Sequence, residues 1–154
     1  MGIRSATYAV AALIAAMVSA SALAASSAPG SRGVTTAKLK AFLTVNQEIP
    51  APKGAKGSGT FTATVTGRKI KFRLSYTGLT GAATAAHIHL ALAGRANPVP
   101  AVTLCGPCRS GQTRTVTASA AVMKKILGGG TYVNVHTAKN AGGEIRGQIA
   151  LIGK

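Results

Sequence analysis

The three histidines of the chain stand where their ring nitrogens could bind a metal ion. His87 and His89 are two apart in an alternating run, so they point to the same face of a predicted strand. His136 ends a second alternating run, opposite the apolar face formed by Val133 and Val135. Neutral imidazoles from two neighbouring strands are ligands that copper or zinc accepts. Strand histidines also serve as hydrogen-bonded structural residues, and the spacing alone leaves both interpretations open.

Acidic residues offer little further chemistry. The chain has two, Glu48 and Glu144, so few carboxylates are available to ligate a metal or to orient the imidazoles. Glu144 and Arg146 are two apart and share one strand face, which predicts structural roles. Their side chains would order the turn at 140–143 or form hydrogen bonds to the ring of His136, without binding a metal themselves. No catalytic residue is predicted, because the chain has no Ser/His/Asp arrangement and no Gly-rich phosphate loop.

Cys105 and Cys108 enclose Gly-Pro, which gives the spacing of a thioredoxin-type redox motif. That chemistry needs the first thiol at a helix N-terminus, where its pKa falls. The four residues are expected in a loop between strands instead. For an exported chain with two cysteines, the sequence therefore predicts one structural disulfide. A thiol oxidoreductase and copper capture by the thiols are the alternatives.

The charge balance indicates an attraction to anionic surfaces. The formal net charge is +16, and Lys69, Lys71 and Arg73 share the polar face of one predicted strand. An anionic envelope polymer or lipid is the partner this pattern favours. A dedicated nucleic-acid function is not predicted, because the cations are scattered and aromatic residues are few.

The N-terminus predicts export. Arg4 precedes the apolar run 9–23, and an Ala-x-Ala-like site follows. We expect a signal peptide at 1–24, a flexible leader at 25–36 and one domain at 37–154, located in the periplasm or outside the cell. The apolar run is shorter than the roughly 20 residues of a membrane span, so no transmembrane segment is expected in the mature chain.

The elements that position these residues are mostly strands. Alternation over 38–45, 59–66 and 69–76 predicts strands with one buried face, and Gly67-Arg68 joins the last two in a hairpin. Further strands are expected within 85–92, 112–119, 131–137 and 144–152, and one helix at 120–127. Short strands with regular turn signals predict an all-β Greek-key sandwich or barrel with one short helix.

Three segments in this order resemble the CHRD domain: Ala-His-Ile-His at 86–89, Tyr-Val-Asn-Val-His-Thr at 132–137 and Gly-Glu-Ile-Arg-Gly-Gln-Ile at 143–149. The resemblance spans about residues 37–152. It implies an extracellular module with a binding role rather than a reaction, since CHRD modules of the animal protein chordin belong to a secreted binder of growth factors.

A weaker resemblance is to copper–zinc superoxide dismutase, an all-β Greek-key family. It implies His87 and His89 as one pair of copper ligands and His136 as a later one. The chain lacks that family's bridging histidine and zinc-site Asp, and Arg146 follows His136 too closely to match its active-site arginine.

The sequence thus predicts a non-enzymatic binding or structural module at the cell envelope. The alternative is a metalloprotein that holds Cu(II) through His87, His89 and His136.

Overall fold

The computed structural model describes Gly2 and residues 36–154. Apart from Gly2, the expected signal peptide lies outside the described residues, and so does the expected leader apart from Thr36. Residues 36–154 form one all-β domain with a single α-helix, which confirms the predicted fold class. Among these residues, no helix combines the length and the apolar character needed to cross a membrane.

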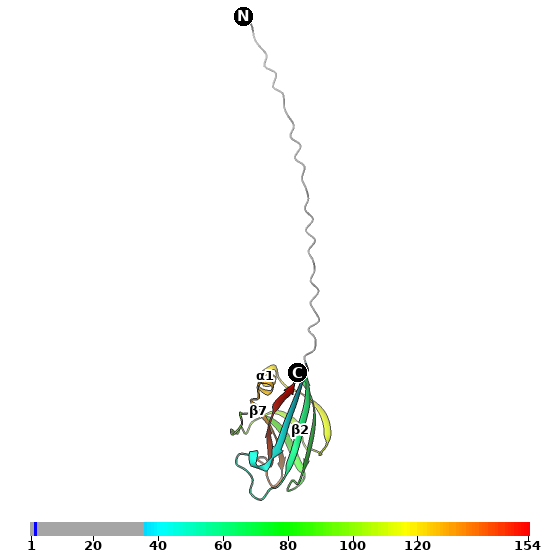
Figure 1. Cartoon of the computed structure of the whole chain (residues 1–154), viewed down its shortest axis with the longest axis vertical. Coiled ribbons are helices and arrows are strands. Elements are labelled where there is room, and N and C mark those ends of the chain that lie inside the picture. The colour runs from blue at the N-terminus through cyan, green and yellow to red at the C-terminus, as the bar shows by residue number, and fades with distance from the viewer. Residues whose placement is uncertain (1, 3–35) are drawn as a thin grey trace. The chain divides into compact units, whose positions relative to one another are not determined.

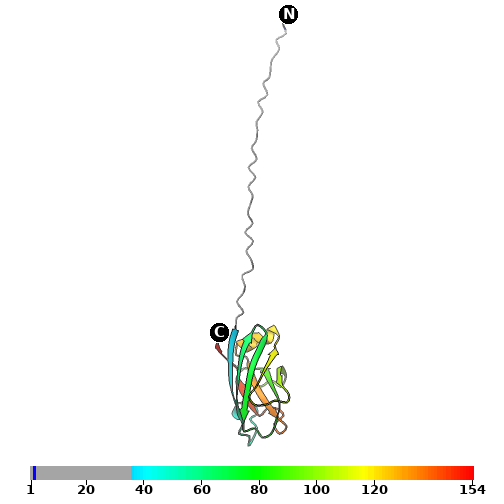
Figure 2. The same cartoon turned by 90° about the vertical axis from the view of Figure 1, so that its right-hand side faces the viewer.

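One continuous sheet curls until its edges almost meet (Figures 1 and 2). Its hydrogen-bonded order is β5-β4-β7-β8-β1-β2-β3-β6, and β9 pairs with β1 beside β8. The edge strands β5 and β6 lie close together, so the sheet is nearly a closed barrel. The strands are β1 (Thr36–Thr44), β2 (Ser58–Thr66), β3 (Lys69–Thr77), β4 (Ala83–Leu90), β5 (Pro100–Cys105), β6 (Gln112–Thr117), β7 (Thr131–Thr137), β8 (Ile145–Gln148) and β9 (Ala150–Gly153).

Strict alternation in β1, β2 and β3 builds one wall of the core. Every second residue points inward, and Phe61 of β2 stacks on Phe72 of β3 with ring centroids 5.7 Å apart. The β2–β3 turn uses Gly67 at φ 58°, a left-handed conformation that glycine adopts without a Cβ clash. The predicted hairpin is therefore present, with its polar residues on the outer face.

A short helix carries the chain across one end of the barrel, at the end where the C-terminus lies (Figure 1). Helix α1 (Ala120–Leu127) has the predicted bounds. The Ser119 hydroxyl accepts a hydrogen bond from the Val122 N–H, which caps the first turn. Met123 and Ile126 are buried in the core. Beyond the helix, β7 returns to lie beside β4, the long connection of a Greek key.

Three details differ from the sequence-based prediction. The segment 100–105, not predicted as a strand, forms β5 beside β4. The single strand expected at 144–152 is two short strands, β8 and β9, which both pair with β1. Every residue of β7 is buried, although the sequence indicated burial only of the face formed by Val133 and Val135. The segment after the 3₁₀ turn η1 (Val45–Gln47), together with the loops after β4 and β7, lies over the opposite face.

Candidate metal site

The pairing of β4 with β7 brings the three histidines together. In the antiparallel register His87 lies opposite Asn134 and His89 lies opposite Tyr132, while His136 lies opposite Ala85. His87 and His136 are therefore diagonal neighbours on one face. The core faces of the same strands carry Ile88, Val133 and Val135, all fully buried. The apolar pattern thus fixes which way the histidines point.

One ligand atom from each histidine lies within 4.8 Å of the other two, so the three side chains converge. His87 Nδ1 is 3.0 Å from His136 Nε2. On the far side of its ring, His136 Nδ1 is 2.9 Å from the Ala141 carbonyl oxygen. A carbonyl only accepts, so Nδ1 donates to it. His136 Nε2 faces the cluster and is also 3.0 Å from the Asn134 side-chain oxygen.

Among the described residues, neither ring nitrogen of His89 has a hydrogen-bond partner of good geometry, although the side chain is only 3% exposed. Its ring stacks on Tyr132 with an interplanar angle of 7° and centroids 5.0 Å apart. The Arg146 guanidinium lies over Tyr132, 3.4 Å from the ring centroid. Packing thus holds the His89 ring in place while its nitrogens stay unpaired. Such buried orphan nitrogens are costly unless a ligand satisfies them.

All three imidazoles are held in the neutral form that binds metals. Burial, assisted by the neighbouring rings of His136 and His89, lowers the pKa of His87 from 6.5 to about 4. Burial also lowers the pKa values of His89 and His136. Backbone groups of Asn97 and Val99 and the Asn134 side chain near His89, and the Ala141 backbone at His136, oppose these shifts without reversing them. A neutral imidazole offers a lone pair to a cation without first losing a proton. The cluster is thus ready for a metal ion at neutral pH.

A cavity of about 410 Å³ opens beside His89 and His136, lined by the segment just after η1 and by the loops after β4 and β7. Glu48 lines it and is buried, with one carboxylate oxygen unpaired among the described residues. Burial raises the pKa of Glu48, and the charge of Arg146 opposes that shift. Gly143 lies against this carboxylate, and a Cβ at that position would collide with it. The carboxyl group therefore shares the cavity with two of the three histidines.

Glu144 organises the turn that supports His136. Its carboxylate accepts hydrogen bonds from the Thr80 N–H and hydroxyl, the Thr137 hydroxyl and the Asn140 amide, at 2.6–2.9 Å. Burial alone would raise the pKa of Glu144, but these hydrogen bonds hold it below its usual value. Its partners are neutral, and it makes no hydrogen bond to His136. Through Asn140 it fixes the turn whose Ala141 carbonyl accepts from His136.

Arg146 acts on the cluster through Tyr132 and does not hydrogen-bond His136. Its guanidinium donates to the Arg95 carbonyl at 2.6 Å, which fastens the β4–β5 loop that lines the cavity. Because β7 alternates, Tyr132 and Asn134 share the face of His136, and the sequence alone could have predicted that they lie near it. The position of Glu48 beside the site could not be predicted, since Glu48 belongs to a loop that tertiary packing folds over β7.

Cys105 and Cys108 are joined by a disulfide. Cys105 is the last residue of β5, rather than a loop residue as expected, and both side chains are buried. The motif therefore lies at a strand end, without the helix N-terminus that lowers a thiol pKa. The Cys108 N–H donates to the Ala83 carbonyl at 3.1 Å, so the small disulfide loop is fastened to the start of β4.

The sequence matches one known family. The family model of the CHRD domain matches residues 39–149, which include all the site residues described above. No curated protein matches the chain, and no solved structure does.

Replacing Glu144 by Gln tests the turn that supports His136. The amide turns one acceptor into a donor that faces hydroxyl and amide donors, so Glu144→Gln should lower the free energy of unfolding by about 2–3 kcal/mol. Urea denaturation measures this loss. Lys139→Gln, at an exposed position in the same turn, should change stability by less than about 0.5 kcal/mol. An unchanged midpoint for Glu144→Gln would contradict the structural role.

The histidine pKa values set a pH dependence for the metal-free protein. The His87 pKa is about 4 in the folded chain against 6.5 as the ordinary value, so the unfolded chain binds more protons in between. Stability should therefore be full above pH 6.5 and fall as the pH drops toward 4. The raised pKa of Glu48 acts in the opposite direction. Thermal denaturation between pH 7.5 and 5 should show the loss, and His87→Gln should make it smaller. A transition temperature that rises toward pH 5 would contradict this account.

Proposed function

The chain belongs to the CHRD domain family, and on that premise we propose that it is an exported, non-enzymatic module that binds copper through His87, His89 and His136. The CHRD domain is an extracellular-type domain. The proposed module keeps a copper ion outside the cytoplasm, where it stores or buffers the metal.

A single observation carries the proposal. Three buried or half-buried imidazoles converge within 4.8 Å, and the most buried of them, His89, has both nitrogens unpaired among the described residues. If His89 were only structural, its ring nitrogens should have hydrogen-bond partners, because an unsatisfied buried polar group lowers the stability of the fold by about 1–3 kcal/mol. A metal ion bound between the rings offsets that cost. The site is thus better explained as a ligand set than as a hydrogen-bonded structural cluster.

The donor set favours copper over the other common metals. Its side-chain nitrogens come from imidazoles, and the two cysteines are joined to each other and lie outside the cluster. Imidazole suits copper and zinc, while magnesium and calcium prefer oxygen ligands. Between the two candidates, copper(II) binds a given nitrogen site more tightly than zinc. A copper ion bound there would supply redox activity, or it would simply be retained by the protein.

The non-enzymatic part of the proposal rests on the chemistry around the cluster. Of the two carboxylates of the chain, Glu144 is occupied by its hydrogen bonds to the turn, and Glu48 is held in a buried position against Gly143. Paired acid and base groups, which hydrolytic chemistry requires, therefore do not meet at the site. This supports retention of a ligand rather than turnover of a substrate.

Copper binding is tested by titration of the purified, metal-free protein with Cu(II). We expect one tightly bound ion. His136→Ala should lower the copper affinity more than about 100-fold, since even the loss of a hydrogen-bond partner of a metal ligand lowers metal affinity 10–100-fold. His89→Phe is the sharper variant. It keeps the stacking on Tyr132 and removes two buried, unpaired nitrogens. It should weaken copper binding equally while leaving the metal-free fold as stable or more stable.

Lys139→Gln serves as the matched control for the titration, because its exposed side chain lies outside the cluster. Its copper affinity should remain within about twofold of the parent, since exposed charges contribute little. Copper affinity that survives in His89→Phe would contradict the ligand set. Failure of the parent protein to bind copper or zinc would end the proposal.

Export is tested on the protein recovered from its native cells. If residues 1–24 are a signal peptide, the mature protein begins at Ala25 and fractionates outside the cytoplasm. Intact-mass measurement of the fractionated protein checks both expectations. A chain that keeps residues 1–24 and stays in the cytoplasm would contradict export.

A further inference from the structure

A second surface, away from the histidines, carries a regular arrangement of cations and hydroxyls. On the outer face of the sheet, β1 presents Lys38 and Lys40, and β3 presents Lys71 and Arg73. The threonines of β2 lie between these two cationic rows, and those of β6 flank the second row. We call this surface the Lys/Thr face, defined by Lys38, Lys40, Thr62, Thr64, Lys71, Arg73, Thr113 and Thr115.

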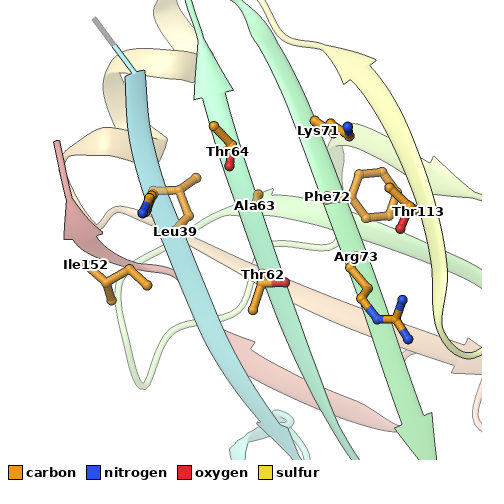
Figure 3. A pocket seen from close by; sticks show the side chains of 10 residues that line it. Leu39, Thr62, Ala63, Thr64, Lys71, Phe72, Arg73, Thr113 and Ile152 are labelled. Atoms are coloured by element: carbon orange, nitrogen blue, oxygen red, sulfur yellow. The ribbon is translucent and has the colours of Figure 1, made fainter.

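The register aligns these side chains into rungs across the strands. One rung runs Lys38–Thr64–Lys71–Thr115, and the next runs Lys40–Thr62–Arg73–Thr113. Figure 3 shows Thr62 and Thr64 on the middle strand, with Lys71 and Arg73 on the strand beside it. Strands lie about 4.8 Å apart, and alternate residues repeat about every 6.8 Å along a strand. The two cationic rows are therefore separated by roughly 10 Å, with the hydroxyl row of β2 between them.

A shallow depression of about 350 Å³ follows this arrangement. Lys38, Thr62, Thr64, Lys71 and Arg73 line it, and Ile152 of β9 closes one side (Figure 3). The depression is thus a groove with cations on both walls and hydroxyls along its floor.

The positive charge of this face is not neutralised within the protein. Glu48 and Glu144 are the only acidic side chains of the chain, and both are buried away from this surface, 7% and 0% exposed. No carboxylate side chain is therefore available at the surface to pair with the cations of β1 and β3. Such an uncompensated face attracts polyanions.

The geometry points to a linear acidic polysaccharide as the partner of the Lys/Thr face. Its chain lies along the threonine row of β2, its carboxylates face the cations of β1 and β3, and its hydroxyls exchange hydrogen bonds with the threonines. The sequence already indicated adhesion by Lys69, Lys71 and Arg73. The structure adds the second cationic row, the hydroxyl floor between the rows and their common register.

Two other classes of polyanion fit this face less well. A membrane surface needs several apolar side chains to enter the interface. Of the apolar residues that line the groove, Leu39, Ala63 and Phe72 are buried, and Ile152 alone is exposed. A single-stranded nucleic acid needs aromatic rings on which its bases stack. Phe42, the exposed aromatic residue of β1, lies beyond the groove lining and is covered by the Lys40 ammonium at 4.3 Å. A sugar polymer needs charge and hydroxyl partners together, and this face supplies both.

Binding of polygalacturonate fragments to the purified protein tests the inference by calorimetry. Lys71→Gln/Arg73→Gln should weaken binding about tenfold, whereas Lys124→Gln/Lys125→Gln on α1 should weaken it less than about twofold, although both remove two charges. Thr62→Val/Thr64→Val keeps the shape and β-branching of the strand but removes the hydroxyls. It should weaken binding about threefold without changing the salt dependence.

Several outcomes would overturn the inference. Equal losses in the two charge variants would mean that diffuse charge, rather than this face, attracts the polymer. Tighter binding to anionic phospholipid vesicles or to single-stranded DNA at the same salt would assign the face to another partner. Equal binding to neutral dextran would exclude recognition of acidic groups. None of these measurements depends on copper, so the inference and the proposed function can fail separately.

Discussion

The antiparallel register between β4 and β7 is the constraint on which the site depends. Ile88, Val133 and Val135 are fully buried on the core side of these strands, and the three imidazoles occupy the opposite side. A slip of one residue would turn each histidine into the core and each apolar residue outward. Burial of aliphatic side chains, at about 25 cal/mol per Å², therefore holds the imidazoles together. The core does so without forming any bond to them.

Because loops cover β7, the aligned imidazoles are buried, and their burial costs free energy. Loops fold over the polar face of β7, keep the imidazoles neutral and leave His89 without hydrogen-bond partners among the described residues. The Glu144 network stabilises one of these loops and so limits the cost. Both carboxylates of the chain are thereby used in the interior. With both carboxylates in the interior, the lysines and the arginine on the outer face of β1 and β3 have no acidic side chain near them.

Local patterns in the sequence predict the strands of the β2–β3 hairpin, the helix at 120–127 and the faces of the histidines. In each case the signal is local: an alternation of apolar and polar residues, a helix cap, or a glycine that ends an element. Strand neighbours are different, because the pairing of β4 with β7 joins residues about fifty apart and depends on the whole barrel. For the same reason Glu48, the covered face of β7 and the two cationic rows on one surface could not be derived from the sequence. Strand β5 was not predicted from the sequence, because Pro100 and the Cys-Gly-Pro-Cys segment are typical of loops. Pairing with β4 nevertheless makes the segment a strand.

The most direct test of the central claim is to count the ligands on copper. X-ray absorption spectroscopy of the copper-loaded protein, combined with pulsed EPR, measures how many imidazoles bind the ion and whether sulfur does. If the β4–β7 register assembles the site, three imidazoles and no sulfur will be found. A copper ion bound by fewer than three imidazoles, or by a cysteine sulfur, would contradict the ligand set of His87, His89 and His136.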